Sequence, residues 1–149
     1  MYYCCCFGHR ELYLKIAEEL DEIVENIIKQ YHTVIFMTGG TGATDSQFIS
    51  TVVKFRRKYP SVKLFLIMPY LTTELNESKE YYENLYDDII IPDELMGVHY
   101  KSAIEKRNQW MVDRCDSIID CTYRNFGGAY KAVKYAEKES KTIIKVTKK

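Results

Sequence analysis

The sequence predicts a single α/β domain over residues 1–149, in which a doubly wound, mostly parallel β-sheet carries helices on both faces. Two observations predict it. Short apolar runs alternate with segments that repeat apolar residues at helical spacing, and no stretch rich in proline, glycine or serine divides the chain. Glycine-bearing and polar turns also follow several of the runs, at the edge of the sheet where ligands of such folds bind.

Six apolar runs have the composition of β-strands, because they are rich in Val, Ile, Phe and Tyr and contain no internal proline. The alternation with helical segments favours parallel pairing of these runs. In chain order they are residues 2–7, 33–37, 62–68, 88–91, 117–121 and 142–146.

Four intervening segments have the apolar spacing of amphipathic helices. The third of these segments begins near Tyr100, and residues 78–85 are expected to form either a helix or an irregular excursion. The groups are Leu12, Ile16, Leu20, Ile23, Val24, Ile27 and Ile28; Phe48, Val52, Val53 and Phe55; Trp110 and Met111; and Ala132, Val133 and Ala136.

Composition bounds the class of protein. With 149 residues, 46% of them apolar, the chain has enough material for one hydrophobic core. The 21 basic and 21 acidic residues cancel, so we expect neither nucleic acid nor a membrane surface as a partner. No apolar stretch approaches the roughly 18 residues of a membrane helix and the N-terminus lacks a secretory pattern, which favours a cytoplasmic location.

The cysteines are expected to be structural. Cys4, Cys5 and Cys6 are consecutive in a predicted strand, where neighbouring side chains point to opposite faces and cannot converge on one metal. Cys115 and Cys121 are isolated in sequence. We therefore expect buried thiols in a reducing compartment and no metal site or cofactor.

Two glycine-centred turns between a strand and a helix are candidate phosphate sites, because main-chain N–H groups at a helix N-terminus attract anions. The first is neither a Walker loop nor the dinucleotide fingerprint. Asp45 either caps the following helix or accepts a ribose hydroxyl. The candidate residues are Gly39, Gly40, Thr41, Gly42, Thr44 and Asp45 in the first turn, and Gly127, Gly128, Ala129, Tyr130 and Lys131 in the second.

Other polar residues follow further strands and should lie on the same edge. His9 and Arg10 either bind phosphate or ribose, or they cap the first helix or are solvated. Arg107 is either a ligand residue or solvated. The further candidates are Gly8, His9, Arg10, Pro69, Tyr70, Arg107, Asn108 and Tyr123.

Five motifs in order resemble the SLOG superfamily over essentially the whole chain. They are Cys-Phe-Gly-His-Arg at residues 6–10, Thr-Gly-Gly-Thr-Gly-Ala-Thr-Asp at 38–45, Lys-Leu-Phe-Leu-Ile-Met-Pro-Tyr at 63–70, Arg-Asn-Gln-Trp-Met-Val-Asp-Arg-Cys-Asp at 107–116, and Gly-Gly at 127–128. The chain most resembles the small YpsA-like proteins, and more distantly the LOG phosphoribohydrolases and the Rossmann domain of DprA.

The resemblance implies a Rossmann-like domain that binds nucleotides, either as a hydrolase that releases a base or as a sensor of ADP-ribose-type signals. In the hydrolases an arginine and a glutamate form the catalytic pair. Arg107 matches the arginine, but Lys134 stands where the glutamate would be. A carboxylate is what cleavage of an N-glycosidic bond needs, so we expect binding without turnover.

Three functions follow as hypotheses. The first is a sensor or sequestering protein for a nucleotide or nucleotide-derived signal. The second is an N-glycosidic hydrolase, or a related phosphoribosyl-transfer enzyme, that uses Arg107 and Asp45. The third is a protein-interaction module in which the pocket is vestigial, with its thirteen tyrosines at an interface. Related domains usually associate, so a homodimer or homotetramer is expected.

Overall fold

A computed structural model describes residues 1–147, and these form one six-stranded sheet in which every strand pair is parallel. The strand order is β4-β3-β2-β1-β5-β6, so β1 lies at the centre with β2 on one side and β5 on the other. The strands are β1 (Tyr2–Phe7), β2 (Val34–Thr38), β3 (Val62–Ile67), β4 (Asp88–Ile90), β5 (Ser117–Asp120) and β6 (Thr142–Lys145).

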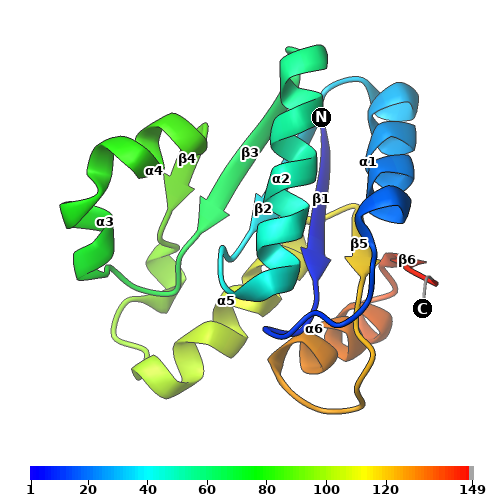
Figure 1. The fold of residues 1–149 in the computed structure, drawn as a ribbon. Coiled ribbons are helices and arrows are strands. Elements are labelled where there is room, and N and C mark those ends of the chain that lie inside the picture. Colours follow the sequence, from blue (N-terminus) through cyan, green and yellow to red (C-terminus); the bar gives the residue numbers. More distant parts are fainter. Residues whose placement is uncertain (148–149) are drawn as a thin grey trace.

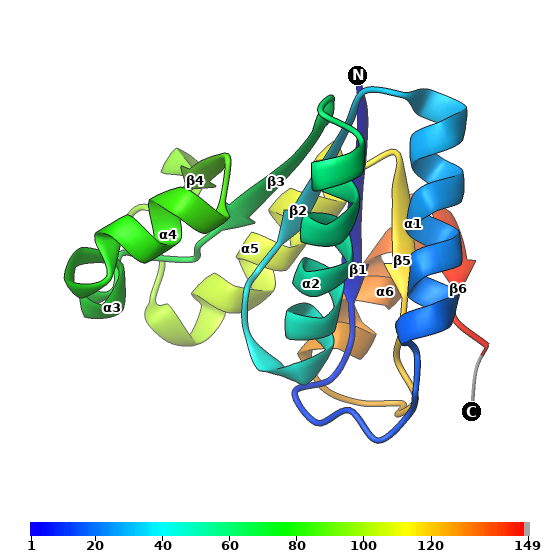
Figure 2. The ribbon, with the colours of Figure 1, turned by 45° about the horizontal axis from the view of Figure 1, so that its top comes forward.

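Helices cover both faces of the sheet, as the sequence predicts. Figure 1 shows α1 and α2 in front of the sheet with α5 and α6 behind it, and Figure 2 shows α3 and α4 beyond the β4 edge. The helices are α1 (Ala17–Tyr31), α2 (Gly42–Lys58), α3 (Thr73–Glu77), α4 (Lys79–Leu85), the short 3-10 helix η1 (Asp93–Leu95), α5 (Tyr100–Arg114) and α6 (Gly128–Lys138).

Each face of the sheet has its own apolar core. Phe36 and Leu64 pack with α1 and α2, whereas Ile35 and Ile118 pack with α5 and α6. This two-sided burial explains why the central strands β1 and β2 are continuous apolar runs instead of alternating ones. Within residues 1–147, every helix is too short or too polar to cross a lipid bilayer.

All five cysteines are buried, and those of β1 alternate between the two cores as expected. Burial raises the pKa of the Cys4 thiol, which keeps it protonated and unreactive. Cys121 is not isolated in space, however. Its Sγ lies 3.5 Å from the Sγ of Cys6 because β1 and β5 are neighbours.

The structure corrects the expected start of the first helix and settles the conformation of residues 78–85. The apolar repeat begins at Leu12, but α1 begins only at Ala17, and the preceding loop places Leu12 and Leu14 against the core without forming a helix. His9 and Arg10 therefore do not cap the first helix. The segment 78–85 is helical, forming α4 after the short α3, although neither helix has a fully buried residue.

Candidate ligand-binding site

A cavity of about 340 Å³ opens where the strand order changes direction, beside the carboxyl ends of β1 and β5. Ligands of open parallel sheets bind at this position because the loops after the two central strands diverge there. Three arginines and two carboxylates line it, which leaves a formal surplus of one positive charge. The lining residues are Cys6, Phe7, Gly8, His9, Arg10, Glu11, Gly39, Thr41, Asp45, Ile104, Arg107, Asn108, Arg124, Phe126, Gly127, Gly128 and Ala129.

The structure brings together most of the candidate residues named from the sequence, but not all of them. Thr44 lies beneath the cavity, where its hydroxyl donates a hydrogen bond of 2.8 Å to the His9 carbonyl. Tyr123 lies behind His9, with its ring edge on the imidazole and 4.6 Å between the ring centroids. The other candidates outside the lining are Gly40, Gly42, Pro69, Tyr70, Tyr130 and Lys131.

Arg107 is the most unusual side chain of the cavity. It is only 4% exposed, and its guanidinium donates to the Ile67 carbonyl at 2.8 Å and to the Asn108 side-chain oxygen at 2.9 Å. In the described part of the chain it forms no ion pair, and its Nη2 has no hydrogen-bond acceptor. Dehydration lowers the pKa of Arg107, with Asp45 acting in the opposite direction. Burying a cation that forms no ion pair is costly, and an anion bound beside Arg107 would offset this cost.

The space for this guanidinium depends on Gly39. A β-carbon at position 39 would lie 2.7 Å from the Arg107 Cζ. Glycine after β2 therefore allows the arginine of α5 to pass directly against the main chain of the first glycine turn.

The first glycine turn is less available to an anion than its sequence suggests. Within the turn, the N–H of Gly40 donates to the Thr38 hydroxyl at 3.1 Å and that of Thr41 donates to Asp45 Oδ2 at 3.0 Å. The N–H of Ala43 donates to the Arg10 carbonyl at 2.8 Å. Asp45 thus caps the turn with one oxygen, while its Oδ1 has no partner among residues 1–147.

The second glycine turn keeps its donors free. Helix α6 begins at Gly128 with no side-chain cap, and its first intrahelical bond runs from Lys131 N–H to the Gly127 carbonyl at 3.0 Å. The N–H groups of Gly128 and Ala129, both in the cavity lining, have no acceptor within the described residues. Of the two turns, the N-terminus of α6 is therefore better suited to an anion, since two residues with unused N–H groups line the cavity and the helix dipole adds to them.

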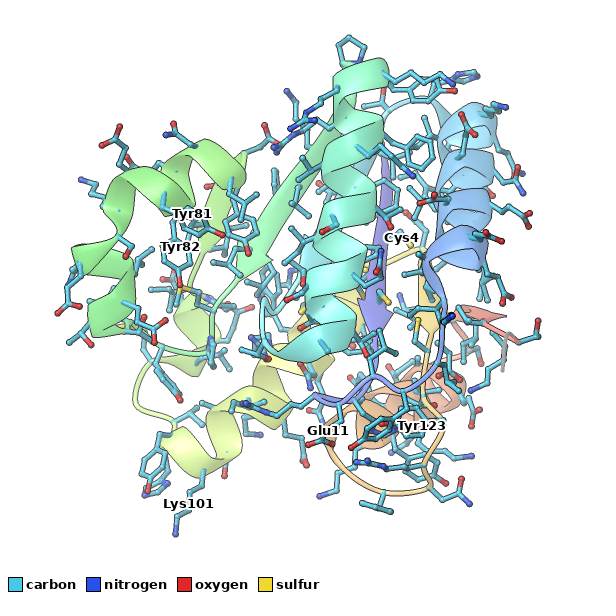
Figure 3. All side chains as sticks on the ribbon, in the orientation of Figure 1. Cys4, Glu11, Tyr81, Tyr82, Lys101 and Tyr123 are labelled. Carbon is cyan, nitrogen blue, oxygen red and sulfur yellow. The ribbon has the colours of Figure 1, made fainter. Side chains whose placement is uncertain are left out.

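The loops after β1 and β5 are joined beside the cavity by hydrogen bonds and an ion pair, and Figure 3 labels two of the residues involved, Glu11 and Tyr123. The Tyr123 hydroxyl donates to the Glu11 carbonyl, and Arg124 forms an ion pair of 2.9 Å with the Glu11 carboxylate. His9 Nε2 accepts a 3.1 Å hydrogen bond from the Arg124 N–H, so neutral His9 carries its proton on Nδ1. Dehydration, then the charge of Arg124, lowers the pKa of His9 and favours this neutral form.

Sequence reasoning missed six lining residues. Cys6 and Phe7 form the floor at the end of β1, and Ile104 comes from α5. Glu11, Arg124 and Phe126 belong to the two loops already suspected, but each lies just outside a glycine motif. Only their position within those loops could have indicated them from the sequence. The contact between Glu11 and Arg124 joins residues that are 113 positions apart, so the sequence gives no sign of it.

A second cavity of about 360 Å³ adjoins the first, and the two share Asn108 and Gly128. Tyr130, Lys131 and Lys134 line it from α6. Lys131 lies 3.7 Å from the carboxylate of Glu105, and Lys134 lies 3.2 Å from that of Glu137. Lys134, which the SLOG resemblance places at the hydrolase glutamate, thus lies outside the main cavity.

Gly8→Ala is expected to destabilise the protein by about 1–3 kcal/mol, because overpacking a close contact forces the neighbouring atoms apart. The added β-carbon would lie 2.2 Å from Thr44 Cγ2, on the side chain that joins α2 to the His9 loop. Urea unfolding measures the change. In the matched control Gly128→Ala, the β-carbon meets no atom within 4 Å, so stability should stay within about 0.5 kcal/mol of wild type. Equal stability of the two variants would contradict the close packing at Gly8.

Asp45 should make stability depend on pH in the direction opposite to most carboxylates. Dehydration raises the pKa of Asp45 from 3.8 to about 6, against the Thr41 N–H and the charges of Arg107 and Arg10. Between these values the folded state holds a proton that the unfolded state has lost, so this contribution to stability is present at low pH and disappears as pH rises through 6. Urea unfolding of wild type and Asp45→Asn at several pH values isolates the effect. The stability difference between them should move in favour of Asn as pH rises from 4 to 7, and a constant difference would refute the raised pKa.

Comparison with known proteins places the fold. No protein-family model matches the chain. It is 25% identical over 140 residues to the uncharacterized SPbeta prophage-derived protein YoqJ of Bacillus subtilis (strain 168), covering 84% of this chain and 82% of that protein. Among solved structures it superposes on DNA processing protein A (DprA) from Streptococcus pneumoniae with a TM-score of 0.69 and 12% identity, and on DprA from Helicobacter pylori with 0.66 and 14%.

These superpositions cover 97% of this chain in both cases, but only 50% and 64% of the two DprA chains, so the chain spans about half to two thirds of their length. At such identities the likeness establishes the fold alone. It supports the SLOG resemblance at that level, as a Rossmann-like α/β domain.

The comparison corrects one expectation. Zero net charge led us to exclude nucleic acid as a partner, but the DprA of H. pylori, which contains this fold, has a described single-stranded DNA binding mode. The exclusion is wrong because net charge averages over the whole surface. A locally positive cavity such as the one beside Arg107 and Arg124 is compatible with a neutral total.

Proposed function

We propose that the protein binds a small nucleotide or nucleotide-derived molecule through its phosphate and does not turn it over. The observation that carries this proposal is the convergence of a buried, unpaired Arg107 and the free N–H groups of α6 on one cavity. His9 adds a neutral Nδ1–H donor to the same set. Such donors suit a phosphate or a similar oxyanion, because a hydrogen bond is stronger when its donor or its acceptor is charged.

The rest of the cavity suits a sugar better than a second anion. Asp45 Oδ1 is an unused acceptor, and a carboxylate accepts hydrogen bonds from ribose hydroxyls while repelling phosphate. A volume of about 340 Å³ lies within the range of small-molecule sites. A phosphorylated ribose therefore matches the donors and acceptors together.

The proposed absence of turnover rests on the position of the carboxylates. Lys134 replaces the glutamate of the related hydrolases and its ammonium pairs with Glu137 beside a different cavity. Glu11 is held by Arg124 at the mouth. Only Asp45 reaches the main cavity without an ion pair within residues 1–147, and its Oδ2 is occupied by the turn.

Isothermal titration calorimetry tests the proposal with the four nucleoside 5′-monophosphates, ADP-ribose, its cyclic isomers, NAD and cyclic dinucleotides. We expect saturable binding of at least one and recovery of the intact ligand by mass spectrometry. A single-stranded oligonucleotide with and without a 5′-phosphate is included, because a protein of this fold binds single-stranded DNA. No heat with any of these probes at millimolar concentration would reject the proposal.

Hydrolysis of an N-glycosidic bond is the second candidate function, and Asp45 is the observation in its favour. A carboxyl whose pKa is raised to about 6 can donate or accept a proton near neutral pH, and Arg107 lies close enough to influence that pKa. Chromatography that detects free base, with loss of release in Asp45→Asn, would establish this activity. Unchanged nucleotide after long incubation would exclude it for the substrates used.

A further inference from the structure

Two large apolar side chains are exposed at the mouth of an otherwise polar cavity. Phe126, on the loop between β5 and α6, is 66% exposed, and Ile104, on α5, is 40% exposed. Both line the cavity that contains Arg107 and the α6 N-terminus. Exposed apolar area is unfavourable in water, so two such side chains from different elements at one opening indicate an apolar part of the ligand.

Phe126 is exposed but supported. The guanidinium of Arg124 lies 5.8 Å from the centroid of the Phe126 ring and 5.0 Å from that of Tyr123. The same guanidinium is fixed by its 2.9 Å ion pair with Glu11. Arg124 therefore packs against one side of the Phe126 ring and leaves the rest of it accessible, which is the arrangement of a stacking platform.

We infer that Phe126 is the stacking platform for a nucleobase, with Ile104 contacting the base from α5 while the phosphate lies further inside. This inference rests on the proposed function and narrows it to ligands that carry a flat aromatic base. The order of the parts follows from burial. Arg107 and His9 are almost completely buried, whereas Phe126 and Ile104 are at the surface, so the charged end enters first.

Calorimetry with two probes separates the base from the phosphate. Ribose 5-phosphate lacks a base, and the tightest-binding nucleoside 5′-monophosphate supplies one. Phe126→Ala should weaken the nucleotide by about 5- to 150-fold, which corresponds to the loss of one aromatic stack, and should change ribose 5-phosphate less than about twofold. Phe126→Trp should retain nucleotide binding. Tyr100→Ala is the matched control, because Tyr100 is 61% exposed on α5 and does not line the cavity.

The possible outcomes distinguish base stacking on Phe126 from phosphate binding in the cavity. Equal affinity of wild type for the nucleotide and for ribose 5-phosphate would overturn the base platform and leave phosphate binding intact. The base platform would also be overturned if Phe126→Ala lost the same affinity for both probes, or lost no affinity for either. Sedimentation that shows a smaller assembly for Phe126→Ala with unchanged nucleotide affinity would assign Phe126 to an interface between copies instead. Wild type that binds neither of these probes, nor any other ligand of the calorimetric panel above, would reject both proposals.

Discussion

Arg107→Met is expected to bind the nucleotide ligand at least about tenfold more weakly, while its free energy of unfolding stays within about 1 kcal/mol of wild type. Two effects on stability oppose each other. Met removes a buried cation that has no ion pair, but it leaves the Ile67 carbonyl and the Asn108 side chain without their donor. Binding has no such compensation, because the phosphate loses a charge-assisted partner. Calorimetry and urea unfolding of the same preparation give the two numbers.

Arg107→Lys is the informative control for this change. Lysine keeps the positive charge but lacks the planar fork that reaches two acceptors and a ligand at once, so its affinity should lie between those of wild type and Arg107→Met. If Arg107→Met bound ligand as well as wild type, the anion site would have to lie elsewhere. A stability loss of more than about 3 kcal/mol would instead make Arg107 a structural residue of the core.

Gly128→Leu is expected to weaken ligand binding by at least about 100-fold without unfolding the protein, because the loss of two main-chain hydrogen bonds to phosphate costs about 1.5–3 kcal/mol each. A β-carbon at this position meets no atom within 4 Å, so the larger side chain has room to form but occupies the cavity. The N–H groups of Gly128 and Ala129 would then be screened from the ligand.

Calorimetry measures this loss, and Gly128→Ala is the graded comparison. The small side chain should cost much less affinity than leucine, since it projects only one carbon into the cavity. Circular dichroism and urea unfolding check that both variants are folded. Wild-type affinity in Gly128→Leu would show that the α6 N-terminus does not bind the ligand, even if Arg107 does.

The strands were predictable from sequence to within one or two residues because both faces of this sheet are buried. The central strands β1 and β2 therefore appear as uninterrupted apolar runs, as in residues 34–37 of β2. The start of α1 was not predictable in the same way. Leu12 and Leu14 pack against the core from an irregular loop, and an apolar residue that faces the core gives the same sequence signal whether or not its backbone is helical.

The candidate site shows a different limit of sequence reasoning. The glycine turns place the cavity on the correct edge, but a turn does not reveal which of its donors remain free. Asp45 and Thr38 occupy donors of the first turn, whereas the second has no side-chain cap. Arg124 went unrecognised because its role comes from contacts with Glu11 and His9, which are 113 and 115 residues away in the sequence. The expected homodimer or homotetramer stays a prediction.

The bonds that join His9 and Glu11 to the loop after β5 also constrain when the cavity can form during synthesis. A nascent chain that has emerged only as far as β4 can pair β1, β2, β3 and β4, since these are consecutive neighbours in the sheet. The loop after β1 would still lack the loop after β5 on the other side of the cavity, because β5 pairs with the free edge of β1 only later. A cotranslational intermediate at this stage therefore has no complete cavity, and the cavity closes only after α5, β5 and α6 have been synthesised.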